Sequence, residues 1–544
     1  SSAASDVYKR QIYNWFGYGG TTAGLMFGES SYYFPIFLGL LSIVVFVWGA
    51  SSLASYFYRR AEKAAPQISL LSRVAVLVAG AICIGLCLFG IRGRMGYNPI
   101  KVSQAYYCED PFLNQLGVNP VFNLLTSTLD DNRKENRTLH LMSEEDALSK
   151  VQKYLHRQGI DRLSPIARKV EREGTPNRRN VVLVFMESMS ANLMGTFGSD
   201  KKLTPYLDSL YQQSLSFSHF YSSGIHTNHG IYSTLYSFPA IMKRNAMKGS
   251  VIPVYSGLPT VLQENGYCNL FFMTHESQYD NMNAFLRTNG FDEIYAQENY
   301  PSEKVVNSFG VQDDFMYQYA LPILNERAGT GNPFFSVLLS ISNHPPYVIP
   351  PYFHPHSDVL EEQIVEYADW SIRQFMQAAE KQPWFDNTIF VFLGDHGKMV
   401  GTPECEMPQS YNHIPLMIYG KDIKPGVYDG FGGQVDVSPT LLGLLNISYL
   451  QNNFGVNLLE EERPCMFFTA DNLIGARDSV NMFIYSPDSQ QEFKYKLEEG
   501  KLHAATGTDE EAFRNLKDYC FSMLQSTESL VKEHKTLDKV SVKK

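Results

Sequence analysis

Thr227 lies between two histidines in the segment SSGIHTNHGIYSTL, residues 222–235. A Ser-Ser-Gly turn precedes it and a helical pattern follows. A threonine hydroxyl is a poor nucleophile at neutral pH, but coordination to a divalent cation strongly favours its alkoxide. The start of a helix also favours an anion. Thr227 is therefore either such a nucleophile or only the N-cap of that helix, and metal ligands elsewhere in the sequence would favour the first.

Candidate ligands stand beside short apolar runs. The runs alternate with helical stretches, which is typical of a parallel sheet flanked by helices, and they lie at 181–186, 269–273, 334–342, 388–393 and 415–419. The polar residues that border them are Glu187 and Ser188, His275, Asn343 and His344, Asp395 and His396, and His413 just ahead of the last run. In open α/β sheets the binding crevice lies outside the carboxyl ends of the strands. We therefore expect these side chains to meet at one edge of the sheet.

The types of these side chains favour a divalent cation. One such residue alone is usually a helix cap or a solvated loop residue. Two carboxylates and an imidazole together, as in Glu187, Asp395 and His396, are suitable ligands for Zn²⁺ or Mn²⁺. With ligands of this kind at the same edge, we expect Thr227 to be the nucleophile rather than a cap.

Two segments near the N-terminus have the length and apolarity of membrane spans. Residues 34–57 contain no charge, and residues 74–91 are all apolar or small. A helix needs about 20 such residues to cross a bilayer. The alternative is a pair of buried core helices. The basic loop between the segments (Arg59, Arg60 and Lys63) favours a cytoplasmic position, which places everything after Ile91 outside the cytoplasm.

Composition narrows the class of protein. The chain has 544 residues, of which 44 % are apolar and 19 % charged, so it can form a large folded domain with accessory segments. Its formal net charge of -10 argues against a general nucleic-acid binder, which needs basic residues to neutralise phosphates. The cysteines are dispersed without CxxC spacing, so they form neither a zinc ribbon nor a disulfide framework.

Several motifs, taken in order, resemble one family. They are NVVLVFMES, LTPYLDSL, a Thr after a short turn, SISNHPPY, FLGDHG and YNHIPLMIYG, between about residues 178 and 450. This pattern is similar to the sulfatase-type domain of lipoteichoic acid synthases and related phosphoglycerol and phosphoethanolamine transferases, in the alkaline phosphatase superfamily. The resemblance implies an α/β fold with a mostly parallel sheet flanked by helices, preceded by N-terminal transmembrane helices.

The same resemblance implies roles for individual residues. It makes Glu187, Thr227, Asp395 and His396 one metal site, with Thr227 as the nucleophile that becomes phosphorylated. The cofactor would be a divalent metal ion, Mn or Zn, with a second ion as an option. Three further histidines would bind the substrate phosphate or that second metal, namely His344, His413 and His275.

The sequence also departs from the family. Where lipoteichoic acid synthases have an Arg that helps to hold phosphoglycerol, the aligned position is Met282, with Arg287 further along. Thr227 is flanked by His226 and Asn228 instead of Lys and Ser. The segment also lacks the Cys or Ser context that sulfatases convert to formylglycine, which argues against sulfate-ester hydrolysis by that mechanism.

The expected organisation has five parts. Residues 1–11 resemble a cloning or assembly scar, 12–91 form the transmembrane region, 92–177 are a linker region, 178–450 are the catalytic domain, and 451–544 are a C-terminal subdomain packed on the sheet edge. Within the linker region, SEEDALSKVQKYLHRQ is expected to be a solvated amphipathic helix. Asp436, in DVSPTLLGLL, is expected to cap a helix rather than to bind metal.

Three functions follow as hypotheses. The first is a membrane-anchored phosphotransferase of the bacterial cell (inner) membrane, with its catalytic domain outside the cytoplasm. It would move a phospho-alcohol head group from a membrane lipid donor to an envelope glycan or lipid acceptor, and no nucleic acid is involved. The second is a phosphate- or sulfate-ester hydrolase of the same family. The third is a non-catalytic membrane sensor or binding module.

Overall fold

The computed structural model describes the chain in two compact units, residues 1–100 and 101–544. Within them it describes all residues except 1–32, 65–68, 96–99, 106, 108–112, 114–115, 120–137, 161–162, 249–251, 499, 506–509 and 538–544. The expected scar at residues 1–11 lies outside the described residues. So does much of the expected linker region.

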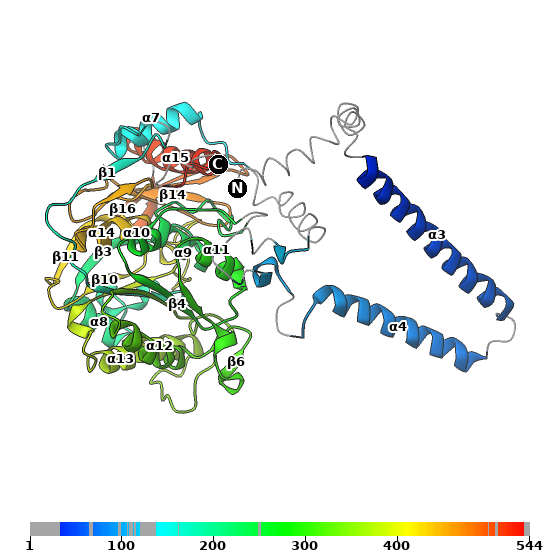
Figure 1. Cartoon of the computed structure of the whole chain (residues 1–544). Helices are drawn as coiled ribbons and strands as arrows, with labels where there is room; N and C mark the ends of the chain where they lie inside the picture. The colour runs from blue at the N-terminus through cyan, green and yellow to red at the C-terminus, as the bar shows by residue number, and fades with distance from the viewer. Residues whose placement is uncertain are drawn as a thin grey trace. The chain divides into compact units, whose positions relative to one another are not determined.

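Two long apolar helices form the described part of the first unit: α3 (Tyr33–Ala64) and α4 (Leu70–Arg92), drawn in blue (Figure 1). Helix α4 begins after Ser69, whose hydroxyl accepts a hydrogen bond from the backbone N–H of Ser72, and it ends at Gly93 in the left-handed conformation. The stretches Leu41–Ala61 and Leu70–Arg92 have mean hydropathies of 1.5 and 2.8, and neither is buried in the structure. The expected pair of apolar helices is thus confirmed.

The second unit is built on a mixed sheet of eight strands in the order β11-β3-β10-β9-β2-β8-β4-β5. The five strands from β9 to the edge strand β5 are parallel, whereas β10 is antiparallel to both neighbours. The expected mostly parallel sheet is confirmed. The strands are β2 (Asn180–Met186), β3 (Leu215–Tyr221), β4 (Cys268–Met273), β5 (Glu293–Tyr295), β8 (Phe334–Leu339), β9 (Thr388–Gly394), β10 (Leu416–Tyr419) and β11 (Gly426–Gly433).

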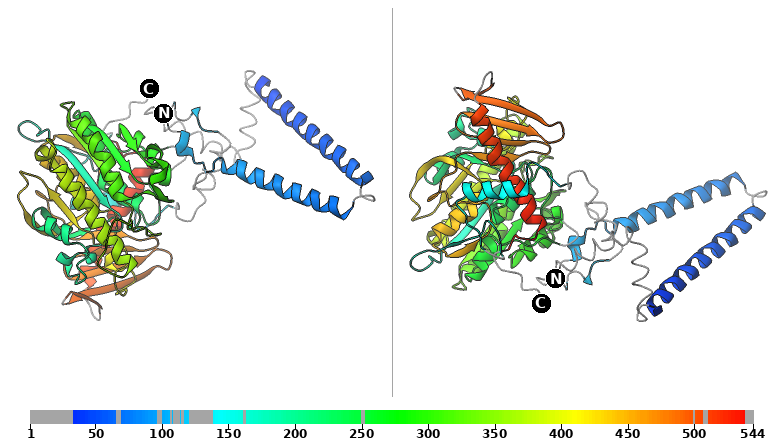
Figure 2. Two further views of the ribbon diagram at one scale, coloured as in Figure 1. Left: turned by 90° about the horizontal axis from the view of Figure 1, so that it is seen from below. Right: turned by 90° about the horizontal axis from the view of Figure 1, so that it is seen from above.

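Strand β2 shows why helices cover both faces of this sheet. All seven of its residues are buried, because its side chains alternate between two hydrophobic cores. Val181, Leu183 and Phe185 face one core, together with α9 (Thr227–Tyr236), α10 (Leu258–Glu264), α11 (Met282–Thr288) and α14 (Val437–Leu444). Val182, Val184 and Met186 face the other, together with α8 (Pro205–Gln212), α12 (Asp313–Ala328) and α13 (Leu360–Ala379). Figures 1 and 2 show these two helical layers with the sheet between them.

A second, antiparallel sheet follows in the sequence, with its strands in the order β13 to β17. Strand β13 lies beside β3 and β11, and helix α15 (Glu510–Lys532) packs on β13, β14 and β15. The strands are β13 (Met466–Thr469), β14 (Ile474–Arg477), β15 (Asn481–Ser486), β16 (Gln491–Glu498) and β17 (Lys501–Ala504). Two short pairs complete the strands: β1 (Arg168–Val170) with β12 (Tyr449–Gln451), and β6 (Val305–Asn307) with β7 (Gly310–Val311).

Two local expectations need correction. The amphipathic helix expected in the linker region exists as α7 (Glu144–Tyr154), but it packs on α15 and buries Ala147 and Val151 instead of standing in solvent. Asp436 makes no side-chain bond to α14, but it caps the short 3-10 helix Gln434–Asp436 that precedes it, where its carboxylate accepts from the backbone N–H of Gly433 at 3.0 Å. The same buried carboxylate also accepts hydrogen bonds from Nε of Arg463 at 2.8 Å and Nη2 at 2.5 Å.

Candidate metal and catalytic site

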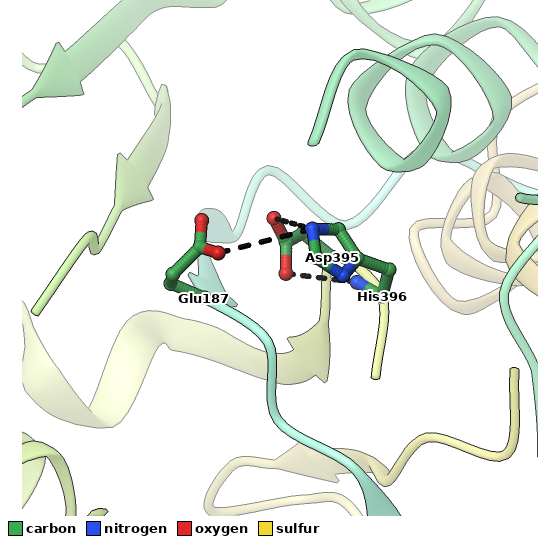
Figure 3. A group of neighbouring side chains, drawn as sticks. All are labelled: Glu187, Asp395 and His396. Carbon is green, nitrogen blue, oxygen red and sulfur yellow. Dashed lines mark hydrogen bonds and ion pairs between the residues drawn. The ribbon is translucent and has the colours of Figure 1, made fainter. Parts of the chain in front are cut away.

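Two adjacent parallel strands deliver the expected ligands. In the register of β2 and β9, Met186 stands opposite Gly394, so the next residues, Glu187 and Asp395, leave the sheet side by side. His396 follows directly. A glycine occupies position 394 because a Cβ there would lie 2.6 Å from the carbonyl oxygen of Met189. The strand ends therefore bring three candidate ligands to one point, as Figure 3 shows.

The three side chains form a compact donor set. One ligand atom from each of Glu187, Asp395 and His396 lies within 4.8 Å of the others. Nε2 of His396 is 3.8 Å from Oε1 of Glu187 and 3.5 Å from Oδ2 of Asp395. Nδ1 of His396 donates to the carbonyl of Gly397 at 2.8 Å, a bond that orients the ring with Nε2 directed at the carboxylates (Figure 3).

Electrostatics also suit a cation. Both carboxylates are fully buried, and burial, followed by the neighbouring Asp395, raises the pKa of Glu187 well above its usual value. Oδ1 of Asp395 accepts hydrogen bonds from the backbone N–H groups of Ser188 and His396, both at 2.8 Å, whereas its buried Oδ2 accepts none from the described residues. Burial without a counter-charge disfavours the charged form of Glu187, and a bound cation would reverse this and give the orphaned oxygen of Asp395 a partner. The donor set therefore fits a divalent cation.

Thr227 is the first residue of α9, and its hydroxyl oxygen lies 3.4 Å from Oε2 of Glu187. The residue at the N-cap is His226, and no side chain caps the helix. Gly230 allows this helix to approach the site, because a Cβ there would lie 2.3 Å from the carbonyl oxygen of Asp395. The structure thus places the Thr227 hydroxyl against the donor set rather than on the helix N–H groups.

The histidines beside Thr227 are held by structural contacts. Nε2 of His226 lies 2.5 Å from Oδ1 of Asp471, which precedes β14 in the second sheet. Nε2 of His229 bonds to the carbonyl of Arg244 at 3.1 Å, and burial lowers the pKa of this histidine to about 3. The second sheet therefore helps to position the start of α9.

The other predicted histidines differ in their surroundings. His344 lies close enough to His396 and Asp395 for their charges to act on it, although burial is the main cause of its lowered pKa. His275 is buried with Nε2 unpaired among the described residues, and its ring packs 4.7 Å from that of Tyr279. Nε2 of His413 bonds to the carbonyl of Ser218 at 2.8 Å, and its ring stacks on Tyr221.

Sequence reasoning missed Lys398, two residues after His396. Its Nζ donates to Oδ1 of Asn343 at 2.6 Å and lies 5.5 Å from the centre of the Tyr347 ring. The amide of Asn343 in turn donates to the backbone carbonyls of Glu187 and Ser188, at 3.1 and 3.2 Å. Burial lowers the pKa of Lys398 to about 8. Its place in GDHGK, next to the ligand pair, was the only signal available.

A second missed group adjoins Thr227. The carboxylate of Asp280 accepts hydrogen bonds from Nδ2 of Asn228 and Nζ of Lys248, both at 3.0 Å. This lysine supplies a cation in the region where the sequence has Met282. Met282 itself is fully buried, and Nε of Arg287 bonds within its own helix to Asn283. These contacts had no sequence signal, because Lys248 is 32 residues from Asp280.

Fold and site together define the class of protein. Residues 179–447 match the family described as Sulfatase, and this part of the chain belongs to that family, within the alkaline phosphatase superfamily. A crystal structure of an alkaline phosphatase superfamily protein from Vibrio parahaemolyticus is similar with a TM-score of 0.66 at 24 % identity, covering 74 % of this chain and 99 % of that one. The lipoteichoic acid synthase LtaP from Listeria monocytogenes is similar with a TM-score of 0.57 at 21 % identity, over 71 % of this chain and 98 % of that one.

Curated relatives give a more particular likeness. The chain is 25 % identical to the lipoteichoic acid synthase-like protein YvgJ of Bacillus subtilis, over 60 % of this chain and 56 % of that protein. It is 24 % identical to the lipoteichoic acid synthase of Staphylococcus aureus, over 65 % of this chain and 58 % of that protein. The chain thus matches little more than half the length of these relatives. Over this length the chain resembles lipoteichoic acid synthases and their relatives.

Proposed function

We propose that the protein is a membrane-anchored, metal-dependent phosphotransferase. It moves a phospho-alcohol head group, of the phosphoglycerol or phosphoethanolamine type, from a membrane lipid to an envelope glycan or lipid acceptor. The observation that carries the proposal is the contact of Thr227 with Glu187, beside Asp395 and His396. The likeness to lipoteichoic acid synthases supports the lipid donor. The two apolar helices support anchoring in the bacterial cell membrane.

The residues of the chain have separable roles in this proposal. Glu187, Asp395 and His396 would hold Mn²⁺ or Zn²⁺, and Thr227 would complete the site. A bound cation supplies positive charge that favours the Thr227 alkoxide and the substrate phosphate. The hydroxyl oxygen of Thr227 attacks phosphorus and the lipid alcohol leaves, so that the head group becomes a phosphothreonine ester. The acceptor hydroxyl then displaces Thr227.

The substrate phosphate needs further positive charge or donors. Lys398 is held by Asn343 beside the carbonyl of Glu187, so we propose that it contacts the phosphate. His344 is proposed for the same task because it lies near His396 and Asp395, and His275 because its buried Nε2 is unpaired. We also assign His413 to the substrate side or to a second cation, since it borders the strand next to β9.

A hydrolase of phosphate or sulfate esters is the second candidate, because the sulfatase-family match applies equally to it. Water would then replace the acceptor and the ligands would be unchanged. Head-group release by the purified full chain, measured with and without envelope acceptors, separates the two. Release at the same rate without any acceptor rejects the transferase.

Mass spectrometry of the Thr227 peptide is the direct test of the transfer mechanism. After incubation with bacterial membranes, the wild-type peptide should carry a head-group phosphate whose mass identifies the transferred group. Protease added to intact spheroplasts should also release the domain after residue 100, if it lies outside the cytoplasm. An unmodified Thr227 under turnover would reject the covalent intermediate.

A further inference from the structure

A cavity of about 510 Å³ lies apart from the metal ligands, between two loops and one helix. Its size is within the usual range for small-ligand sites. One wall is helix α13, which presents Glu366, Asp369, Trp370 and Arg373 on a single face because they follow at intervals of three and four residues. The other walls are the segments 202–205 and 352–356.

Both wall segments belong to loops that start at the metal site. The first loop begins after β2 with Glu187, and the second begins after β8 and includes Asn343, whose amide holds the Glu187 carbonyl. Since β2 and β8 are parallel neighbours, the two loops leave the same edge of the sheet. The charges of two glutamates act on Lys398: Glu187 in the candidate metal site, and Glu361 in the first turn of α13. The cavity is therefore on the catalytic side of the sheet.

The carboxylates of the cavity already have partners. Glu366 accepts from the backbone N–H groups of His356 and Ser357, at 2.7 and 3.0 Å. Asp369 accepts from the backbone N–H groups of Tyr206 and Leu207, at 3.1 and 2.8 Å. Burial also raises the pKa of Asp369 to about 7, so its negative charge is weak at neutral pH.

Among the basic side chains of the cavity, His356 pairs with Glu366 through Nδ1 at 3.1 Å, whereas three others have no such partner in the part of the chain that the structure describes. Within the described residues, the side chains of Lys202, His354 and Arg373 form no hydrogen bond or ion pair, although the charge of Arg373 acts on Asp369. All three are exposed. An arginine fork and a lysine at one cavity are suited to phosphate or carboxylate groups.

Aromatic side chains form the rest of the surface. The ring of Trp370 lies 5.5 Å from that of Phe353 and 6.3 Å from that of Tyr352, and Tyr352 is 56 % exposed. The hydroxyl of Tyr352 is fixed by Asp314, at 2.9 and 3.0 Å from its two oxygens. A rigid aromatic surface of this kind packs well against the apolar face of a sugar ring, while nearby polar groups orient the ligand.

We infer that this cavity binds an anionic glycan, whose sugar ring packs on Trp370 and whose phosphate or carboxylate group contacts Arg373 and Lys202. The identification of this glycan as the acceptor rests on the proposed function. The acceptor would then be held at the same sheet edge as Thr227, by residues that take no part in the chemistry. Binding to the cavity does not require turnover.

The test uses the full chain in detergent, carrying Thr227→Ala so that no transfer occurs. Isothermal titration calorimetry compares phosphorylated maltohexaose, unphosphorylated maltohexaose and inorganic phosphate. The phosphorylated glycan should bind on the order of tenfold more tightly than either of the others, since it engages both the rings and the cations. Equal affinity for inorganic phosphate would leave only a simple anion site and overturn the inference.

Variants locate the binding. Arg373→Gln and Trp370→Ala should each weaken binding of the phosphorylated glycan by about tenfold or more, and Arg373→Lys should recover part of the loss. Lys424→Gln, at an exposed lysine outside the cavity, is the matched control and should bind normally. Arg373 is exposed, so its replacement tests the inference even if Trp370→Ala fails to fold. Unchanged affinity in Arg373→Gln would overturn it.

A second measurement separates this inference from the proposed function. Transfer to a phosphorylated glycan is followed in chains that keep Thr227. If the glycan binds as expected but no transfer product forms, the inferred glycan site is supported and the proposed transferase activity is rejected. If transfer occurs equally well with Arg373→Gln and with wild type, the transferase activity is supported and the inference that the cavity is the acceptor site is rejected.

Discussion

If Thr227 is the proposed nucleophile, its replacement by Ala should lower activity far more than it lowers the stability of the fold. Among the described residues the hydroxyl makes one bond, at 3.4 Å to Glu187, and it does not cap α9. Loss of such a bond costs about 0.5–1.5 kcal/mol. Alanine regains up to about 0.7 kcal/mol through its higher helix propensity. The free energy of unfolding should therefore change by less than about 1 kcal/mol.

Activity should respond very differently. Loss of a covalent nucleophile lowers turnover by about 10³-fold or more, which corresponds to about 4 kcal/mol in the activation free energy. Thr227→Ser keeps the oxygen and should retain measurable turnover. Metal binding should weaken less than activity, because Glu187, Asp395 and His396 still provide three donor groups.

The assay follows release of the lipid head group by the purified full chain, alongside thermal unfolding and metal content. Thr234→Ala is the matched control, since Thr234 lies in the same helix and its buried hydroxyl has no partner among the described residues. That variant should keep near-normal turnover. If the Thr227 Ala and Ser variants are equally active, the hydroxyl is not the nucleophile and the proposed mechanism is refuted.

The remaining predictions concern the metal, the approach of α9, and stability. Asp395→Asn should lower the bound divalent metal to background after dialysis, and chelation of the wild type should abolish activity until Mn²⁺ or Zn²⁺ is restored. Gly230→Ala should place a methyl 2.3 Å from the carbonyl oxygen of Asp395. The free energy of unfolding should therefore fall by about 1–3 kcal/mol, and both the melting temperature and the activity should fall with it. Asp436→Asn leaves the buried Arg463 unpaired and should destabilise the fold by about 3–5 kcal/mol, as thermal unfolding would show. Burial lowers the pKa of His413 to about 4, so the unfolded chain binds a proton more readily; stability should rise with pH from about 4 to 6.5, and His413→Gln should flatten that rise in unfolding curves.

The sequence predicts those strands of the sheet that are buried on both faces. The runs at 181–186, 269–273 and 388–393 each fall within a strand of the structure, because a central parallel strand is apolar throughout. Strand β3 was missed. Its sequence LSFSHFY interleaves serines and a histidine with aromatics, and its pairing with β10 and β11 depends on residues about 200 positions later.

The candidate site likewise has residues that the sequence predicts and residues that it does not. Glu187, Asp395 and His396 follow directly on recognisable strands, so sheet geometry alone predicts that they meet. The bond from Lys398 to Asn343 and that from Lys248 to Asp280 depend on how loops fold over the site, for which the sequence has no periodic signal. The pairing of Asp436 with Arg463 had no sequence signal either, because the two residues are 27 positions apart.

The position of α15 has a consequence for biosynthesis. This helix, near residue 520, covers the apolar face of α7 near residue 150, and Tyr519 contributes to the buried network of Arg463 and Asp436. During translation, Glu187, Thr227 and Asp395 all leave the ribosome before α15 exists. Until about residue 530 has been made, the nascent chain carries an uncovered α7 and an incomplete shell around Asp436. A chain interrupted before α15 therefore exposes the apolar face of α7 to the quality-control machinery of the cell.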